Sequence, residues 1–375
     1  MNFISSFSGY FYFLKKIRLT KNKKVIFYSE SKNYRNYFID LINALSKRDH
    51  VTVIYLTSDI NDMDLMEQNI KPIFIGSGIF RLLLFAFLKC DMMIMTLTDL
   101  GNHEIIKSKN CKNYLYMFHS LVSTHKTYTH NAFKNFDTIL TNGEYQKTEL
   151  EYCENLFNLP KKRIINTGYI YLEKLKKEKK DNTNPKKILF APSWNKSNKN
   201  LFNDYSYEII DELIDKNFSI TLRTHPELIR TANKKITYLK NKYKNNKNFE
   251  INLNISDLNV LNDSLILITD NGGIALEYIL VQKKPVLFIN YMDKIHNNFY
   301  DQIKLEALEE KFKKKFGFIM QVSDLKNINL KIKEAIVNFE KNKNEINNFA
   351  SDNGVVLKNQ TINAEKTIVD LLDQY

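Results

Sequence analysis

The stretch "SLILITDNGGIALEYILVQKKPVLFIN", residues 264–290, decides the fold. The apolar run 265–268 predicts a strand, residues 273–282 predict a helix, and the run 284–290 predicts a second strand. A helix between two strands is the crossover that joins neighbouring strands of a parallel sheet. The glycine pair before the helix leaves backbone N–H groups open to a phosphate or pyrophosphate, although such pairs also serve only to pack a helix closely on a strand.

Strands and helices alternate along the whole chain, which predicts an α/β protein with parallel sheets covered on both faces. The series begins at "KVIFYSE", residues 24–30, pauses at a charged and polar stretch, and restarts at "KILFAPSW", residues 187–194. We therefore expect two doubly wound, Rossmann-like domains that face a cleft. The expected parts are a first domain at 24–178, a linker at 179–186, a second domain at 187–340 and a helical tail at 341–375 that crosses back to the first domain.

The composition is that of a globular protein. The 375 residues are 43% hydrophobic and 26% charged, which is enough for two domains with a core each. The three cysteines have neither metal-ligand nor CxxC spacing, so we expect them to be reduced and structural, and we expect no metal site. No secretory leader is visible at the N-terminus. No membrane span is visible either, because Arg81, Lys89 and Asp91 interrupt the most apolar stretch. We therefore expect a cytoplasmic protein.

The net charge of +13 indicates an anionic partner. No RRM, KH, zinc-finger or helix-turn-helix pattern supports nucleic acid, and a phosphate-handling enzyme or a protein resting on anionic lipid fits the charge at least as well. Residues 1–23 place an aromatic cluster before several lysines, which is typical of an amphipathic anchor in the membrane interface. The alternative is a helix that packs on its own domain.

Four polar stretches of the second half lie at or just beyond the ends of predicted strands: 191–195, 223–227, 269–273 and 289–294. In open parallel sheets, ligands bind beyond the carboxyl ends of the strands. The shared position of the four stretches is more informative than any one of them. No zinc motif, P-loop, nucleophile elbow or protein-kinase motif set accompanies them.

Single side chains at strand ends suggest chemical roles. Arg223 is suited to bidentate binding of phosphate oxygens, and His225 is suited to binding phosphate or protonating a leaving group. Glu277 follows the glycines by one helical turn and is suited to accepting hydrogen bonds from ribose hydroxyls, whereas Asp270 is also suited to capping the helix. In the first half, His119 follows a strand-like run and suits a general base for a hydroxyl, although a lone histidine is usually structural.

At these residues the chain resembles the CDP-glycerol glycerophosphotransferase family of teichoic-acid-type primases and polymerases. The resemblance runs from about Lys24 to Glu340. "MFHSLVSTHK" (117–126) is similar to the WHG-like histidine motif of the family, "ILFAPSWN" (188–195) to its APTW motif, "LRTHPE" (222–227) to its R-x-HP motif, and 261–290 to its SD–ITDYSS–FD–KP segment. The chain departs from the family where Phe118 replaces Trp, Ser120 replaces Gly, and Asn271-Gly272-Gly273 replace Tyr-Ser-Ser.

The resemblance implies a GT-B fold whose first domain binds the acceptor and whose second domain binds a nucleotide-activated donor. The implied reaction is attack of an acceptor hydroxyl on the β-phosphate of CDP-glycerol, with release of CMP. His119 would be the base, His225 a second catalytic residue, and Ser120 and Lys126 acceptor-binding residues. The implied donor-binding residues are Ser193, Trp194, Arg223, Asp270, Asn271, Gly272, Gly273 and Glu277. The sequence requires no cofactor, and a divalent metal ion is compatible with phosphoryl transfer.

Two other functions stay open at this point. A glycine pair followed by an acidic residue is also a habit of GT-B glycosyltransferases that use a nucleotide sugar. A non-catalytic basic protein that binds nucleic acid or membrane is the second alternative, and it predicts that alanine at His119 or His225 is harmless. We expect a glycerophosphotransferase of teichoic acid or capsule polysaccharide synthesis, which acts on a polysaccharide or lipid-linked acceptor of the cell envelope. It would work in the cytoplasm, or peripherally on the inner face of the membrane in contact with anionic lipid, and without nucleic acid.

Overall fold

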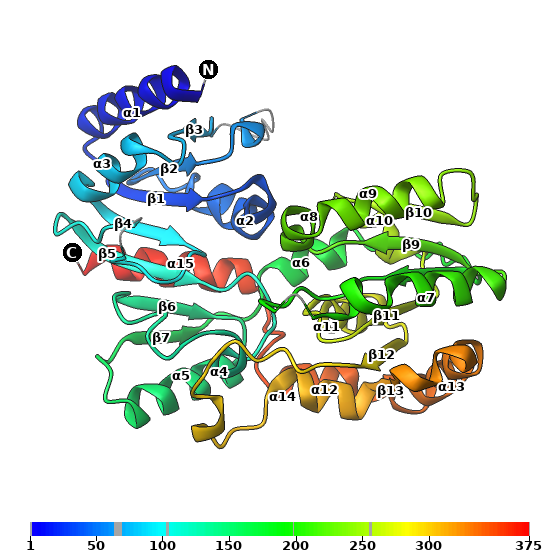
Figure 1. Cartoon of the computed structure of the whole chain (residues 1–375). Coiled ribbons are helices and arrows are strands. Elements are labelled where there is room, and N and C mark those ends of the chain that lie inside the picture. The colour runs from blue at the N-terminus through cyan, green and yellow to red at the C-terminus, as the bar shows by residue number, and fades with distance from the viewer. Residues whose placement is uncertain (1, 64–69, 103–104, 198, 255–256, 375) are drawn as a thin grey trace. The chain divides into compact units, whose positions relative to one another are not determined.

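The computed structural model describes residues 2–63, 70–102, 105–197, 199–254 and 257–374 (Figure 1). The chain forms two compact units, each built around one parallel sheet with helices between successive strands, which confirms the predicted α/β class. The first unit comprises Met1–Ser120, Tyr128–Glu173 and Asn353–Tyr375, and the second comprises Leu121–Thr127 and Lys174–Asp352.

The sheet of the first unit has the order β3-β2-β1-β4-β5-β6-β7, with all strands parallel. This is a doubly wound sheet, and its order reverses between β1 and β4. The strands are β1 (Lys23–Ser29), β2 (Val51–Thr57), β3 (Ile73–Phe74), β4 (Cys90–Met95), β5 (Cys111–Met117), β6 (Thr138–Thr141) and β7 (Arg163–Asn166).

Two apolar cores explain why the strands of this sheet read as continuous apolar runs. Along β1, Val25 and Phe27 belong to one core, whereas Ile26 and Tyr28 belong to the other. Because both faces are covered, neither set of alternating side chains is polar. The core that contains Val25 and Phe27 is covered by α2 (Arg35–Leu45) and α15 (Gln360–Asp373). The core that contains Ile26 and Tyr28 is covered by α1 (Asn2–Leu19), α3 (Ile79–Phe87) and α5 (Glu144–Leu156).

The sheet of the second unit has the order β10-β9-β8-β11-β12-β13 and is also parallel throughout. Its order reverses between β8 and β11. The strands are β8 (Lys187–Phe190), β9 (Ser219–Arg223), β10 (Phe249–Asn252), β11 (Ile266–Thr269), β12 (Val286–Asn290) and β13 (Gly317–Gln321). The helices are α4 (Thr124–Thr127), α7 (Leu201–Asp215), α8 (Pro226–Thr231), α9 (Asn233–Lys242), α10 (Asn259–Asp263), α11 (Ile274–Glu277), α12 (Leu308–Phe316), α13 (Ile328–Asn342) and α14 (Ile346–Asp352).

The division of the chain differs in detail from the domain limits expected from the sequence. The expected linker, 179–186, belongs to the second unit, because the Asn182 side chain donates to the Asp263 carboxylate and the Lys180 N–H donates to the Asn262 side chain. The change of unit falls earlier, after Glu173, within α6 (Tyr171–Lys177). The tail returns to the first unit at Asn353 rather than at residue 341, and α15 then packs beside α2.

Two further sequence expectations concern cysteines and membranes. Cys90, Cys111 and Cys153 are buried and unbridged, and the first two face each other on β4 and β5 with their sulfur atoms 3.2 Å apart. Among the described residues, no helix is long and apolar enough to cross a membrane.

Candidate functional site

The ends of β8 and β11 meet where the strand order of the second sheet reverses. Asp270, directly after β11, is buried, and it accepts hydrogen bonds from the Ser193 N–H at 2.7 Å and from the Ser193 hydroxyl at 2.9 Å. Ser193 in turn follows β8. The point of reversal is where open parallel sheets bind ligands. Asp270 therefore holds the loop after β8 in place and does not cap α11, whose N-cap residue is Gly273.

This geometry gives a prediction for the Asp270 carboxylate. We expect Asp270→Ala to lower the free energy of unfolding by about 1–3 kcal/mol, because it leaves the buried Ser193 N–H without an acceptor. Ser193→Ala keeps that backbone bond and should cost about 1 kcal/mol or less. Urea unfolding of both variants measures the difference. Equal losses in the two variants would contradict this role for Asp270.

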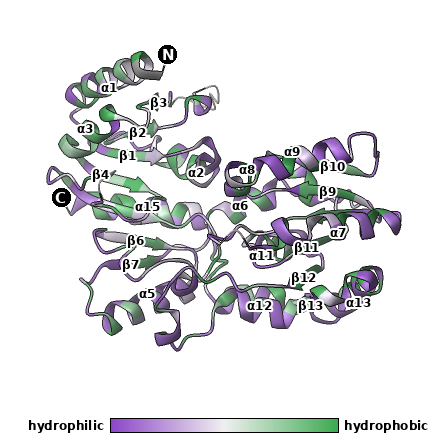
Figure 2. Ribbon diagram, viewed as in Figure 1, coloured by the Kyte–Doolittle hydropathy of each residue, from purple (hydrophilic) through white to green (hydrophobic). Residues whose placement is uncertain are grey.

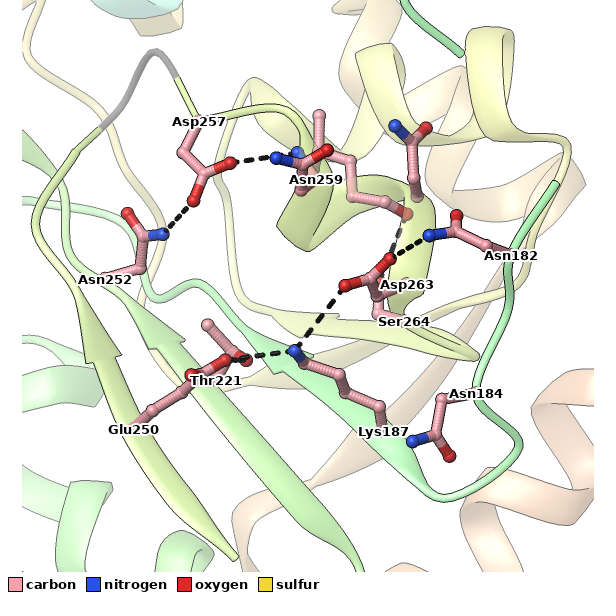
Figure 3. A network of polar contacts seen from close by, with 12 residues as sticks. Asn182, Asn184, Lys187, Thr221, Glu250, Asn252, Asp257, Asn259, Asp263 and Ser264 are labelled. Carbon is pink, nitrogen blue, oxygen red and sulfur yellow. Dashed lines mark hydrogen bonds and ion pairs between the residues drawn. The ribbon is translucent and has the colours of Figure 1, made fainter. Parts of the chain in front are cut away.

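Arg223 is the last residue of β9, and its side chain is held at the strand end. Its Nη1 donates to the backbone carbonyl of Asp257 at 3.2 Å. Asp257 is itself fixed by the Asn252 side chain, at 2.7 Å, and by the Asn259 N–H, at 3.0 Å (Figure 3). The network around Asp257 thus orients the Arg223 guanidinium before any anion binds.

His225 begins α8, and its ring is oriented by two contacts. Its Nδ1 accepts a hydrogen bond from the Glu227 N–H at 3.2 Å, so that His225 is the N-cap of the helix. Because Nδ1 accepts, the neutral ring carries its proton on Nε2, which is then able to donate. The imidazole also stacks on Trp194, with ring centroids 6.3 Å apart and planes at 18°.

The side chain of Asn271 is engaged by the protein. Its amide nitrogen donates to the Met292 carbonyl at 2.7 Å, and its amide oxygen accepts from Lys313 of α12 at 3.0 Å. The two bonds join the ends of β11 and β12 to α12. Lys313 was missed by sequence reasoning, because a lysine in an amphipathic helix gives no signal of a partner forty-two residues earlier.

The segment after the glycine pair is more irregular than the single helix expected from the sequence. The α-helix α11 continues as a π-helix over Tyr278–Gln282, a form that often occurs at functional sites. The buried Tyr278 hydroxyl bonds to Ser264 and holds this segment against the start of β11. At Gly272, a Cβ would lie 3.0 Å from the Thr269 hydroxyl, so close packing is one reason for this glycine. Glu277 is half-buried in α11.

His296, in the loop after β12, also faces Trp194, with ring centroids 5.5 Å apart. Burial and the nearby charges of Lys294 and Lys196 lower its pKa to about 4. Sequence reasoning missed His296, because it lies six residues beyond the strand end. The segments after β8, β9 and β12 therefore bring Trp194, His225 and His296 together. The contacts between Ser193 and Asp270 join the segment after β11 to the segment after β8.

The lowered pKa of His296 predicts a pH dependence of stability. Between pH 6.5 and about 4 the unfolded chain binds a proton at this histidine and the folded chain does not, so the free energy of unfolding falls as the pH falls through this window. In His296→Gln we expect this fall to be smaller by about 1–2 kcal/mol, allowing for solvent at a half-buried ring. Urea unfolding at a series of pH values measures it, with the exposed His50→Gln as control. An unchanged pH profile would contradict the prediction.

In the first unit, His119 follows β5 at the carboxyl edge of the sheet. Its ring is half-buried and makes T-shaped contacts with the rings of Tyr34 and Tyr37, whose centroids are 5.1 and 5.8 Å away. Both tyrosines come from the segment after β1, next to the point of reversal. The His119 carbonyl accepts from the Tyr169 hydroxyl at 3.2 Å. The histidine is therefore positioned by its neighbours and still partly open to a substrate.

Ser120 and Lys126, expected together at the acceptor, fall in different units. The Ser120 carbonyl accepts from the Asn142 side chain in the first unit. Lys126 belongs to the second unit, is buried, and donates to Glu310 of α12 at 2.8 Å. Burial lowers the pKa of Lys126, but the Glu310 hydrogen bond and the charges of Glu310 and Glu309 outweigh burial and raise the pKa. The charge of Lys126 is thus balanced within the protein.

Among the described residues, no group of three or more histidine, cysteine, aspartate or glutamate side chains is arranged to hold a metal ion. The donors at the strand ends of the second sheet are instead the Arg223 guanidinium, the imidazoles of His225 and His296, and the Lys313 ammonium group. This set suits an anion such as a diphosphate.

Comparison with known proteins gives a family and a fold. The family model described as CDP-Glycerol:Poly(glycerophosphate) glycerophosphotransferase matches residues 10–357. Among solved structures, a form of the wall teichoic acid polymerase TagF soaked with CDPG has a TM-score of 0.60 at 14% identity, over 99% of this chain and 97% of that chain. A UDP-GlcNAc 2-epimerase from Neisseria meningitidis bound to UDP-GlcNAc has a TM-score of 0.59 at 14% identity, over 94% and 100%. A comparison with curated protein sequences gave no match. The structural likeness confirms the GT-B type of architecture expected from the sequence.

Proposed function

The chain belongs to the CDP-glycerol:poly(glycerophosphate) glycerophosphotransferase family, a family of transferases, and from this premise we propose that it transfers glycerol phosphate from CDP-glycerol to a hydroxyl of a cell-surface polymer. The observation that supports the proposal is the group of cationic and hydrogen-bond-donating side chains at the carboxyl ends of the strands of the second sheet, beside its reversal point, on motifs that resemble those of the family. A non-catalytic basic protein, the alternative reading, accounts neither for this group of side chains nor for the family motifs on which they lie.

The second unit would bind the donor. Arg223, fixed through Asp257, would hold the diphosphate bidentately, and the backbone N–H groups of Gly272 and Gly273 would add neutral donors. The Nε2–H of His225 would donate to the phosphate that leaves with CMP. Because these groups are fixed in advance, they would stabilise charge as it develops without first reorganising.

The first unit would activate the acceptor. His119 would take the proton of an acceptor hydroxyl, whose oxygen forms a bond to the β-phosphorus while the bond to the bridging oxygen breaks and CMP leaves. The product would be a phosphodiester between the acceptor and glycerol. We propose a polysaccharide or lipid-linked, teichoic-acid-like acceptor, for which the family membership is the support.

A GT-B glycosyltransferase that uses a nucleotide sugar is the competing proposal, supported by the glycine pair followed by Glu277. Trp194, the only tryptophan, reports on the donor, because it contacts His225 and His296. We expect CDP-glycerol and CMP to change its fluorescence saturably, and Arg223→Ala to abolish the change. Arg230→Ala is the matched control, since Arg230 is exposed and pairs with Glu227. CDP-ribitol and UDP-, GDP- and CMP-sugars complete the panel.

Two outcomes of this titration would contradict the proposal. A response to a UDP- or GDP-sugar alone would move the protein to the glycosyltransferases. No response to any nucleotide, together with no thermal shift, would argue against a nucleotide site at these strand ends.

A further inference from the structure

Seven residues that follow β5 of the first unit in the sequence fold into the second unit. Leu121–Thr127, which we call the inserted segment, comes directly after Ser120, where that stretch of the first unit ends, and it contains the short helix α4. Its His125 and Lys126 are only 1% and 4% exposed. Because burial of a polar side chain is unfavourable unless the side chain is bonded, the partners of these residues show what the inserted segment holds in place.

The backbone of the inserted segment is bonded to the loop between β12 and α12. The carbonyl of Lys126 accepts from the His296 N–H at 2.8 Å and from the Asn297 N–H at 3.3 Å. The buried side chain of Asn297 donates to the carbonyl of His125 at 2.9 Å. The loop is therefore fixed at the histidine that faces Trp194.

Side chains of the inserted segment hold the middle of the same loop. The ring of His125 stacks on Tyr300, with ring centroids 5.5 Å apart and planes at 12°, and its Nε2 donates to the Leu305 carbonyl at 3.1 Å. The ammonium group of Lys126 lies 5.9 Å from the centroid of the Tyr300 ring. The loop is thus packed on the inserted segment as well as bonded to its backbone.

The first turn of α12 is bonded to the inserted segment through two carboxylates. Glu309 accepts from the N–H and from the hydroxyl of the buried Ser123, at 3.0 and 2.6 Å, and the Ser123 hydroxyl accepts from the Leu308 N–H at 2.8 Å. Glu310 accepts from Lys126 at 2.8 Å. The bonds to the two carboxylates are charge-assisted, so they are stronger than bonds between neutral groups.

Both ends of the stretch 296–310 lead to the candidate donor site. At one end, His296 faces Trp194, and beyond the other end Lys313 donates to the side chain of Asn271. Figure 2 shows hydrophobic and hydrophilic residues mixed along α12, whose apolar side chains are buried while its polar ones bond to the inserted segment and to Asn271. The inserted segment therefore holds a part of the chain whose residues reach the donor site.

We propose that the inserted segment positions the stretch 296–310 for donor binding, with Ser123 and Lys126 as positioning residues. The inference rests on the proposed function in one respect, the choice of CDP-glycerol as the ligand. If the stretch is released, only the fraction of molecules in which it lies in place binds the donor, and the apparent affinity falls by that fraction. In the competing role, Lys126 leaves Glu310 and binds a phosphate of the acceptor.

Substitution of Lys126 tests the inference. Lys126→Met leaves the Glu310 carboxylate without its cation, and we expect it to raise the dissociation constant of CDP-glycerol by roughly tenfold. The kcat at saturating donor and the KM for the acceptor should stay within about threefold of the wild type. Lys126→Met/Glu310→Gln removes both charges of the pair, so the dissociation constant should return to within about threefold of the wild type.

Two further variants provide a milder test and a matched control. Ser123→Ala removes the hydroxyl bonds to Glu309 and Leu308 but keeps the N–H bond, and it should raise the dissociation constant by roughly threefold. Lys314→Met breaks an exposed ion pair with Glu306 on the same helix, and it should change the dissociation constant by less than about twofold. Thermal unfolding checks that all variants fold.

Acrylamide quenching of Trp194 in the nucleotide-free protein separates this inference from the proposed function. In Lys126→Met the quenching constant should rise by roughly twofold, because local opening exposes the half-buried indole, whereas Lys314→Met should quench like the wild type. If the wild type binds no nucleotide, the proposed function fails, while the quenching still tests the positioning.

Three results would overturn the inference. The first is unchanged quenching in Lys126→Met. The second is a raised KM for the acceptor beside an unchanged dissociation constant of CDP-glycerol, which would make Lys126 an acceptor ligand. The third is a Lys126→Met/Glu310→Gln variant as impaired as Lys126→Met, which would show that Lys126 does not act through Glu310.

Discussion

His119→Ala should lower kcat by about 10²–10⁴-fold, because it removes the imidazole that directly follows β5 and with it the proposed base. His119 lies in the first unit, whereas the proposed donor-binding residues all lie in the second. The dissociation constant of CDP-glycerol should therefore stay within about twofold of the wild type. Single-turnover transfer and Trp194 fluorescence measure the two quantities separately.

His119 also contacts two tyrosine rings, so its loss must be separated from a packing defect. His119→Gln fills much of the same space between Tyr34 and Tyr37 but is no base. It should be as inactive as the alanine variant and fold like the wild type. His50→Ala changes an exposed histidine of the same unit and should be fully active. Activity in His119→Gln near that of the wild type would exclude a base at this position.

Substitution of His225 should also lower activity strongly, and two different variants separate its catalytic role from its role as a helix cap. Its Nδ1 caps α8, whereas Nε2 is the atom proposed to act on the donor phosphate. Asparagine is a good N-cap, so His225→Asn should keep the cap and lose the Nε2–H. We expect kcat/KM to fall by about 10²–10³-fold in both His225→Asn and His225→Ala.

Stability separates the two variants of His225. Only His225→Ala should also lose about 1 kcal/mol of unfolding free energy, because it leaves the Glu227 N–H without its acceptor. Urea unfolding and steady-state kinetics on the same preparations give both numbers. A fully active His225→Asn beside an impaired His225→Ala would show that the histidine serves as a helix cap alone.

The strand ends were predictable because a parallel sheet brings them to one edge. The apolar run before Thr269 predicted β11, and the polar residues after it could then only lie at the ligand-binding edge. The same reasoning placed Ser193, Arg223 and His225 at that edge, as the structure does. The prediction rested on the regular alternation of strands and helices, which the local sequence determines.

Contacts between distant segments were not predictable from local sequence. The residues around Lys126 do not indicate that it belongs to the second unit, because its hydrogen-bond partner Glu310 is 184 residues away in the sequence. The bonds of Lys313 to Asn271 and the π-helix held by Tyr278 also arise from tertiary packing. The expected linker was misplaced for the same reason, since its charged residues resemble a flexible segment although Asn182 is hydrogen-bonded.

Product analysis tests the central claim most directly. The full chain would be incubated with CDP-glycerol labelled in the glycerol and with a poly(glycerol phosphate) or lipid-linked acceptor. The account predicts equal amounts of CMP and of labelled glycerol phosphate in the acceptor, and formation of both products slowed by about a hundredfold or more with His119→Gln or His225→Asn. Label left in CDP-glycerol, while a UDP-sugar releases UDP and glycosylates the acceptor, would contradict it.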